Sequence, residues 1–432
     1  MSWWLSKIKL NFMKSKKIKI GIIGLGYVGL PLILLINKKY EVFGFDSNEE
    51  KIKSLKKNSS YISDVSNKEL KKLNKNNIFS MKEVDNIYKC DYIIFCVPTP
   101  LRNNTPDMSY ITMAFKRIFK YLKKNQTIIL ESSVYPGATE KIFKKELNKK
   151  FKIGKDFFLG YSPERIDPGT DKKDKKLDYK KITKLAAGFS NACLIKVLYL
   201  YKRIFKNIFP CKSIKIAETA KLFENIFRAV NIGLVNEMKM ITSKLNINIH
   251  DVVDAAASKP FGFRKFVPGP GVGGHCIPID PIFMTWLANK NNYKTEFINL
   301  SSKINTDVTN WIIKKILEHH SKNKKIKCLI LGIAYKKNVN DLRESPALRI
   351  FEKLKDRKNT TIDLCDPYVK VLNCKNINYQ TINVRSFKSY DSVILLTDHS
   401  SFNYKKILKQ SKLIFDTRGV YKDISNKKII HL

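Results

Sequence analysis

Short apolar runs recur along the chain, separated by longer stretches in which apolar residues are spaced at helical intervals. A short apolar run bounded by polar or turn-forming residues is typical of a buried strand, and the wider spacing is typical of an amphipathic helix. The runs in the first half of the chain are Ile18–Ile23, Glu41–Phe45, Asp91–Val97, Thr127–Leu130 and Phe157–Gly160. The runs near the C-terminus are Ile326–Gly332, Thr361–Cys365, Ser392–Leu396 and Leu413–Phe415. Because strands that alternate with helices form parallel sheets, the pattern predicts an α/β protein with two such sheets.

Between these two groups of runs the spacing is helical. One helix is predicted from about Ile214 to Leu245, roughly 45 Å long at 1.5 Å per residue, and further helices reach about His320. Its apolar stripe consists of Ile216, Ala220, Phe223, Phe227, Val230 and Leu234. Lys221, Asn225 and Arg228 share another face. That polar face is either a solvated stripe or a set of donors aimed at one ligand, and so long a helix is also a candidate dimer interface.

The first apolar run leads into a glycine-rich turn, Gly24-Leu25-Gly26-Tyr27-Val28-Gly29, followed by a helical segment. In this context the first glycine permits the tight turn, the second lets a pyrophosphate approach the backbone, and the third lets helix and strand pack closely. Asp46 ends the next run, where an acid binds a ribose diol and repels a 2′-phosphate. The stretch therefore predicts NAD binding. The fold class is α/β, with two Rossmann-like parallel-sheet domains joined by a central all-helical segment that contains a long helix.

Polar residues follow several predicted strands. Thr99, Ser133 and Glu164 each come shortly after a run in the first domain, and ligands of open parallel sheets bind at the carboxyl ends of strands. Ordinary turn or capping roles remain an alternative for each of them. In the second domain the residues after the runs include basic side chains, which suits a second ligand that carries phosphate.

The stretch Pro268–Pro281, PGPGVGGHCIPIDP, is a loop with a defined path, because its prolines and glycines exclude a regular helix or a central strand. It presents Cys276 next to His275, with Asp280 four residues further on. Loops of this kind carry function more often than packing. The hypothesis is that Cys276 is the nucleophile of a nicotinamide-dependent oxidation.

Composition changes this interpretation little. The 432 residues allow two or three domains, and the net charge of +43 is typical either of a protein that binds nucleic acid or membrane surfaces or of a lysine-rich background. The lysines are spread over every segment, which favours the background. None of the eight cysteines forms a C-x-x-C pair, so no metal site is expected and reduced thiols in the cytoplasm are predicted. No apolar window is long enough to span a membrane, and residues 1–16 are interpreted as an N-terminal extension rather than a signal peptide.

Six segments then stand together in order: GLGYVGLP, ESSVYPGATE, YSPERIDPG, KLFENIFRAVNIGLVNEM, GPGVGGHCIPIDP and LGIAYKKNVNDLRESPAL. From about Lys17 to the C-terminus the chain resembles the nucleotide-sugar 6-dehydrogenases, the family of UDP-glucose and GDP-mannose dehydrogenases. The resemblance implies a four-electron oxidation of the C6 hydroxyl of a nucleotide-bound hexose to a carboxylate, with two NAD⁺ used in succession and a cysteine thiohemiacetal and thioester on the way.

The resemblance also implies roles for individual residues. Cys276 is the expected nucleophile, Lys221 and Asn225 stabilise the oxyanion and position water, Asp280 lies beside that pair, Glu164 assists proton transfer or thioester hydrolysis, and Ser133 contacts water and cofactor. The cofactor-binding positions are Gly24, Gly26, Tyr27, Val28, Gly29, Asp46, Thr99, Ser132 and Arg343. The substrate-binding positions are Glu164, Arg165, Lys221, Asn225, Gly273, Tyr335, Lys336 and Arg418.

Two departures from the family pattern narrow the substrate. UDP-glucose and GDP-mannose enzymes usually carry a lysine where this chain has Ile279, so the loop resembles the branch that acts on UDP-N-acetylhexosamines. The segment ESSVYPG is one residue longer than the usual form. The expected product is a uronic acid for capsule or O-antigen. UDP-glucose 6-dehydrogenase, or an inactive basic relative that binds nucleic acid, remains an alternative.

The resemblance also implies how the chain is divided into domains and which partners it binds. The domains are residues 17–210 for NAD, 211–320 for dimerisation and catalysis, and 321–432 for the UDP sugar. The expected partners are a UDP sugar and a second copy of the chain bound through the central helix, without specific nucleic acid or membrane binding.

Overall fold

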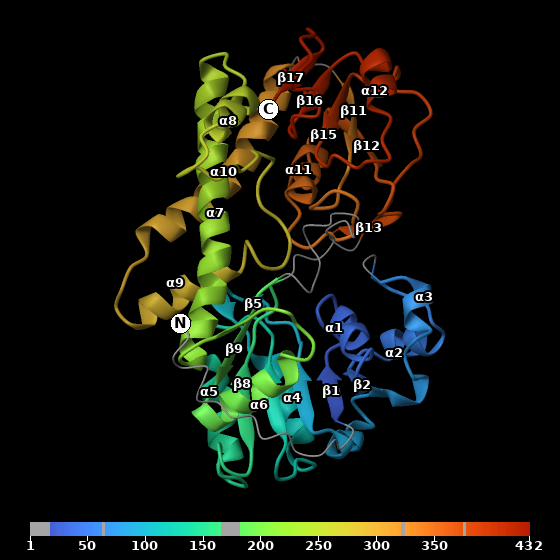
Figure 1. Ribbon diagram of the computed structural model, residues 1–432. Helices are drawn as coiled ribbons and strands as arrows, with labels where there is room; N and C mark the ends of the chain where they lie inside the picture. The colour runs from blue at the N-terminus through green and yellow to red at the C-terminus, as the bar shows by residue number, and fades with distance from the viewer. Residues whose placement is uncertain (1–17, 63–64, 166–181, 321–324, 375–376) are drawn as a thin grey trace. The chain divides into compact units, whose positions relative to one another are not determined.

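The computed structural model describes residues 18–62, 65–165, 182–320, 325–374 and 377–432 (Figure 1). The predicted N-terminal extension, residues 1–16, lies outside them. The chain forms two compact units. The first contains the described residues up to Glu224 together with Ile282–Leu287, and the second contains Asn225–Pro281 and Ala288–Leu432. The three-domain division expected from the sequence remains a prediction.

The first unit is built on an eight-stranded sheet with the order β10-β9-β8-β7-β4-β1-β2-β3. Its strands are β1 (Lys19–Ile23), β2 (Glu41–Asp46), β3 (Ile78–Ser80), β4 (Tyr92–Phe95), β7 (Thr127–Leu130), β8 (Phe158–Tyr161), β9 (Lys184–Gly188) and β10 (Ile208–Pro210). The helices are α1 (Gly29–Ile36), α2 (Glu49–Lys56), α3 (Asn67–Leu70), α4 (Ser109–Phe119), α5 (Ala138–Leu147) and α6 (Asn191–Tyr201), with 3₁₀ turns at Lys75–Asn77 and Val84–Lys89. A small hairpin joins β5 (Leu101–Arg102) to β6 (Thr105–Pro106).

Neighbouring strands of this sheet are parallel except for one pair, because β9 runs antiparallel to β8. The register pairs Gly160 with Gly188 and Tyr161 with Ala187. As a result β9 begins, at Lys184, on the edge of the sheet where β8 ends. The sequence predicted a parallel sheet, and this single reversal brings a lysine to its functional edge.

The second unit contains a five-stranded parallel sheet with the order β12-β11-β15-β16-β17. Its strands are β11 (Ile326–Leu331), β12 (Thr360–Cys365), β15 (Ser392–Leu395), β16 (Ile414–Asp416) and β17 (Ile429–His431), and a hairpin joins β13 (Val371–Cys374) to β14 (Ile377–Gln380). Its helices outside the central segment are α11 (Pro346–Lys355) and α12 (Tyr404–Gln410).

The predicted strands are confirmed, and burial explains why they were visible in the sequence. Every residue of β4, β7 and β15 is buried. A parallel sheet covered by helices on both faces needs apolar side chains on both, so its strands are written as continuous apolar runs. The strands without such a run are short or partly exposed, among them β3, β10 and β14.

The segment 211–320, which the structure describes throughout, contains four helices and no strand: α7 (Ile214–Lys244), α8 (Ile249–Ala257), α9 (Asp280–Lys290) and α10 (Glu296–Glu318). The helix α7 is 31 residues long, and Figure 1 shows it as one continuous helix. Two residues of its polar face are buried, with Lys221 at 8% and Asn225 at 6% exposure, and Arg228 is half-buried. Its apolar stripe is largely open to solvent, with Phe223 at 66% and Leu234 at 57%. The alternative of a solvated polar stripe is therefore wrong.

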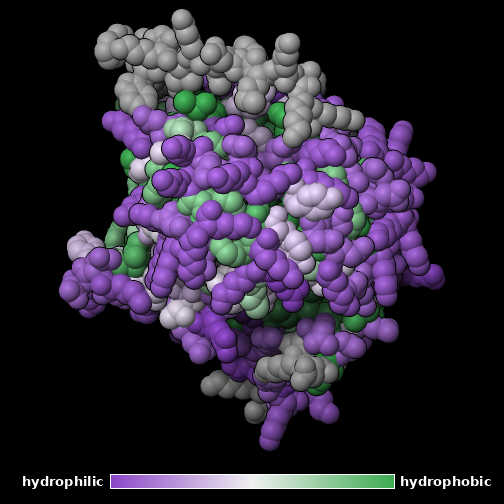
Figure 2. Space-filling model, turned by 90° about the horizontal axis from the view of Figure 1, so that it is seen from below, coloured by the Kyte–Doolittle hydropathy of each residue, from purple (hydrophilic) through white to green (hydrophobic). Residues whose placement is uncertain are grey.

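The lysine-rich composition is reflected on the surface. On the face in Figure 2, hydrophilic residues predominate and the hydrophobic ones form small scattered patches. Among the described residues, no helix combines the length and apolar character needed to cross a bilayer.

Candidate active site

The glycine turn between β1 and α1 has the geometry that its sequence requires. Gly24 adopts a φ of +92°, and a Cβ atom there would lie 2.7 Å from the carbonyl oxygen of Cys96. A Cβ atom at Gly29 would lie 1.8 Å from the carbonyl oxygen of Gly24, so only glycine permits this crossing of turn and helix. A Cβ atom at Gly26 would meet nothing within 4 Å. The turn is therefore tightly packed at Gly24 and Gly29. At Gly26 it leaves space, and there a pyrophosphate can approach the start of α1.

The carboxylate of Asp46 is built into this turn. It is buried, and its two oxygens accept hydrogen bonds from the backbone amides of Leu25 (2.8 Å) and Asn48 (2.9 Å). Tyr27 and Val28 lie in the turn itself, just before α1 begins. Asp46 therefore supports the turn and still presents an acid at the end of β2, as a dinucleotide site requires.

The carboxyl ends of β4 and β7 are joined by two side-chain hydrogen bonds. The Thr99 hydroxyl donates to the carbonyl of Ser133 at 2.7 Å, and the Ser132 hydroxyl donates to the carbonyl of Val97 at 2.6 Å. The predicted cofactor residues Thr99 and Ser132 therefore lie on one edge of the sheet with Ser133. In this structure their hydroxyl groups order the loops that end the two strands.

A charged network follows the end of β8. The Nζ atom of Lys184 lies 2.7 Å from Glu131 Oε2 and 3.4 Å from Glu164 Oε2, and the Tyr201 hydroxyl donates to the other oxygen of Glu131. Burial by itself lowers the pKa of Lys184, but attraction to Glu131 and Glu164 outweighs it and raises that pKa. The sequence prediction named Glu164 and did not find Lys184, because a lysine at the start of an Ala- and Gly-rich strand has no distinctive signal.

Arg165, a predicted substrate residue, is held by a two-point ion pair. Its Nη2 atom lies 2.6 Å from Glu224 Oε1, its Nε donates to Glu224 Oε2 at 3.3 Å, and its Nη1 donates to the carbonyl of Thr183 at 2.6 Å. Glu224 lies on α7 between Lys221 and Asn225. The pair therefore fixes the segment after β8 to the part of α7 that belongs to the first unit.

In the second unit, Asn225 and Asp280 form a buried pair. The side-chain amide of Asn225 donates to Asp280 Oδ2 at 2.6 Å. Asp280 is the first residue of α9, and its backbone amide donates to the carbonyl of Cys276 at 2.8 Å. The predicted nucleophile, acid and amide thus come from one cluster of contacts. Lys221 is buried one helical turn before Asn225 on α7.

The loop that carries Cys276 is anchored at its beginning by buried polar groups. Gly269 donates its amide to Asn236 Oδ1 at 3.0 Å and accepts a hydrogen bond from the Nζ atom of Lys239 at 3.0 Å. The hydroxyl of Thr309, on α10, donates to the carbonyl of Pro270 at 2.8 Å. Burial lowers the pKa of Lys239 to about 7. These anchors are polar residues on helices that the sequence showed only as amphipathic, and the prediction missed them.

Further along, the same loop packs against the segment after β11. A Cβ atom at Gly273 would lie 2.7 Å from the Cβ of Tyr335, and the amide of Gly274 donates to the carbonyl of Arg343 at 2.9 Å. Arg418 follows β16 and donates its Nε to the carbonyl of Leu396 at 2.6 Å. The predicted substrate residues Gly273, Tyr335 and Arg418 therefore belong to the second unit together with the cysteine loop.

Two predicted ligand residues lie beside these. Lys336 follows Tyr335 directly and is partly exposed. Arg343, predicted to contact the cofactor, forms a two-point ion pair with Asp341, with distances of 3.0 Å and 2.6 Å for its Nε and Nη2 atoms. The carboxylate holds the guanidinium group in a fixed orientation in the segment that the cysteine loop contacts.

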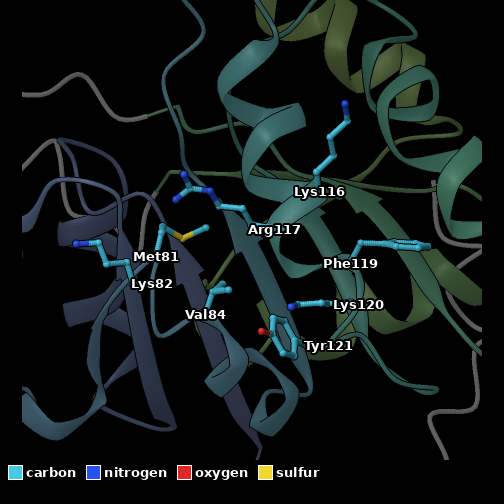
Figure 3. Close-up of a pocket in the computed structure, with 8 residues that line it drawn as sticks. All are labelled: Met81, Lys82, Val84, Lys116, Arg117, Phe119, Lys120 and Tyr121. Carbon is cyan, nitrogen blue, oxygen red and sulfur yellow. The ribbon is translucent and has the colours of Figure 1, made fainter.

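An open cavity of about 460 Å³ lies elsewhere in the first unit, between the end of β3 and the C-terminal part of α4 (Figure 3). Its lining residues are Met81, Lys82, Val84, Lys116, Arg117, Phe119, Lys120 and Tyr121. Figure 3 shows the charged ends of Lys82 and Lys116 pointing in different directions rather than converging on one point. None of the predicted site residues lines it, so the cavity is not the site of the chemistry.

The parallel sheets, the glycine turn and the acid at the end of β2 define a dinucleotide-dependent oxidoreductase. Three models of the UDP-glucose/GDP-mannose dehydrogenase family match the chain. The NAD binding domain matches residues 18–201, the central domain residues 215–307 and the UDP binding domain residues 329–423. The chain belongs to this family.

Known proteins are similar over almost the whole chain. Protein CapL of Staphylococcus aureus is 34% identical over 415 residues, which cover 93% of this chain and 96% of that protein. UDP-N-acetyl-D-glucosamine 6-dehydrogenase of Pseudomonas aeruginosa is 33% identical over 419 residues, with 93% and 97% covered. The solved structure of a UDP-D-ManNAc dehydrogenase from Pyrococcus horikoshii has a TM-score of 0.84 at 28% identity and covers 95% of this chain and 97% of its own.

These matches confirm several predictions. The protein is an NAD-dependent nucleotide-sugar dehydrogenase, and the UDP binding domain confirms that a UDP sugar is its substrate class. The roles of individual site residues remain predictions.

Proposed function

We propose that the protein oxidises the C6 hydroxyl of a UDP-N-acetylhexosamine to a carboxylate. The observation that carries the chemistry is the buried contact between Asn225 and Asp280, since Asp280 also donates its backbone amide to the carbonyl of Cys276. Relatives named as UDP-N-acetyl-D-glucosamine and UDP-N-acetyl-D-mannosamine dehydrogenases, at 33% and 31% identity, support an acetamido sugar. Ile279, in place of the lysine usual in UDP-glucose enzymes, supports the same branch.

The proposed reaction has four parts. When bound by the first unit, NAD⁺ would supply the hydride acceptor for two oxidations, first of the alcohol to the aldehyde and then of the thiohemiacetal to the thioester. Between them the Cys276 thiolate adds to the aldehyde carbon. Water finally cleaves the thioester, so one alcohol, two NAD⁺ and one water give one carboxylate, two NADH and three protons.

Each proposed residue has a separate task. Lys221 and Asn225 donate to the oxygen that becomes negative when the thiolate adds, because fixed donors are most effective where charge develops. Asp280 holds the Asn225 amide in place, and Glu164 accepts a proton from the attacking water. Anchoring the cysteine loop at Gly269, through Asn236 and Lys239, fixes the thiol before the substrate arrives.

A substrate panel tests this proposal. The purified protein with NAD⁺ should release NADH with one of UDP-N-acetylglucosamine, UDP-N-acetylgalactosamine or UDP-N-acetylmannosamine. Its kcat/KM for that sugar should exceed the value for UDP-glucose by about 100-fold, since a site built to hydrogen-bond an acetamido group discriminates strongly against a ligand without one. A preference for UDP-glucose would contradict the acetamido assignment and leave the family unchanged.

We also propose a homodimer formed through α7. Exposed apolar residues follow one side of this helix and the chain just after it: Ile216, Phe223, Phe227, Leu234, Met238, Ile241 and Leu245. Their spacing of seven, four and three positions is that of a helix–helix seam. A second copy is the natural occupant, because the same stripe on two chains related by a two-fold axis is self-complementary.

Light scattering tests the dimer. The protein should have twice the mass of one chain, and Leu234→Glu should reduce this to a single chain, because the introduced charge would be buried in the seam. Lys141→Glu, on an exposed position of α5, is the matched control and should leave the mass unchanged. A monomeric wild-type protein at micromolar concentration would refute the proposal.

The proposal also covers the cellular role of the protein. We propose that the product feeds a bacterial surface polysaccharide such as capsule or O-antigen, and that the protein acts in the cytoplasm.

A further inference from the structure

Lys184 is a buried charged residue that belongs neither to the glycine turn nor to the cysteine loop. It is a lysine at 2% exposure, at the first position of β9. The antiparallel register of β8 and β9 pairs Tyr161 with Ala187, and continuing it three residues past Tyr161 places Lys184 opposite Glu164. Opposite charges at facing positions of neighbouring strands attract, so the reversed strand brings a cation to the predicted catalytic acid.

The surroundings of Lys184 fix its ammonium group from several elements. Glu131, at the end of β7, is 1% exposed and accepts from Lys184 at 2.7 Å, and the Tyr201 hydroxyl on α6 holds its second oxygen. The ring of Phe205 lies 5.4 Å from Nζ. Among the described residues, Cys96 is a further titratable neighbour, and its thiol is neutral because burial raises its pKa well above the usual value.

We propose that Lys184 is a positioning residue for Glu164. Its buried ammonium group, anchored on Glu131, holds the Glu164 carboxylate in a fixed orientation at the carboxyl end of β8. The inference rests on the proposed function, since the task of Glu164 belongs to that reaction.

The distances indicate that Lys184 interacts with both Glu131 and Glu164 rather than with only one of them. Nζ lies 3.4 Å from Glu164 against 2.7 Å from Glu131, and Coulomb attraction falls only as the inverse of distance, so both carboxylates interact with the same charge. Glu131 is fully enclosed, whereas the side chain of Glu164 is 16% exposed. The buried acid therefore serves as the anchor, and the more accessible acid is the one that can meet a substrate.

A four-protein cycle tests the proposal. Lys184→Met alone would leave Glu131 buried without its cation and could prevent folding. The reference is therefore Glu131→Gln, which keeps the shape and the contact with Tyr201. The second protein adds Lys184→Met to it. The third and fourth are these two proteins with Glu164→Gln added.

In the two proteins that keep Glu164, replacement of Lys184 should lower kcat by about 30-fold. The KM for the UDP sugar and the affinity for NAD⁺ should change by less than about 3-fold, because Lys184 acts on the reaction and not on binding. With Glu164→Gln present, the same loss should change kcat by less than about 3-fold, because residues that act through one another are not additive.

An equal loss of kcat in both backgrounds would overturn the proposal and leave Lys184 a structural residue. The midpoints of urea unfolding of the same four proteins provide a test that does not depend on activity. The shifts in midpoint caused by the two substitutions should be non-additive, and additive shifts would contradict the Lys184–Glu164 contact. Failure of the proposed function is distinguished because it would be seen in the wild-type protein, which would then form no uronic acid.

Discussion

Replacement of Cys276 by alanine should abolish formation of the uronic acid, with a loss of at least about 10⁴-fold in the rate of acid release, as expected when a nucleophile is removed. The first oxidation does not need the thiol. The variant should therefore still bind NAD⁺ and the UDP sugar, and it should form at most one NADH per sugar together with an aldehyde that a hydroxylamine reagent traps. Simultaneous measurement of NADH, aldehyde and acid checks this result.

Cys365→Ala provides the matched control. Cys365 is the last residue of β12, is partly exposed and lies in the same unit, but it is outside the cysteine loop. This variant should turn over at close to the wild-type rate. Acid formation by Cys276→Ala at a normal rate would contradict the covalent route, whereas loss of activity in both variants would indicate a general sensitivity of the unit to thiol replacement.

The second large effect is expected for Asp280→Asn. Asp280 is 2% exposed and accepts the Asn225 amide at 2.6 Å, so the substitution keeps the shape of the side chain and removes a buried charge from the cluster around Cys276. We expect kcat to fall by about 10² to 10³-fold with a small change in KM, the size seen when a fixed electrostatic contribution is lost. Steady-state kinetics with the preferred UDP sugar measures both parameters.

Asp280 also begins α9, where an acid stabilises the helix, so the melting temperature must be measured together with the rate. Asp254→Asn is a suitable control, because Asp254 is an acid on α8 whose ion pairs among the described residues are with Lys265 and Lys422, which lie outside the cluster. It should leave kcat unchanged. A similar fall in kcat for both variants, or a normal kcat for Asp280→Asn, would remove Asp280 from the proposed machinery.

The sequence predicted what depends on local pattern. The nine strands were visible because sheets covered on both faces require uninterrupted apolar runs. The turn from Gly24 to Gly29 was visible because each glycine has its own steric reason, and the structure confirms the reason at Gly24 and Gly29. The glycines and prolines around Cys276 predicted a loop in the same way, although the last two residues of the predicted loop, Asp280 and Pro281, begin α9.

What depends on distant contacts was not predictable. The strand Lys184–Gly188 contains nothing that fixes its direction, so the reversal that brings Lys184 opposite Glu164 could not be read from it. The burial of Lys239 and Asn236 could not be predicted from the sequence for a related reason. A polar stripe on an amphipathic helix has the same pattern whether it faces water or a polar loop, and only the fold decides between them.

The central claim is that one thiol-dependent site carries out two successive oxidations on one UDP sugar. The most direct test is to let the purified wild-type protein convert a limiting amount of its preferred UDP-N-acetylhexosamine with excess NAD⁺, and to count NADH against the uronic acid formed. The account predicts two NADH for each acid and no accumulated aldehyde. One NADH per sugar with an aldehyde as the final product would contradict it.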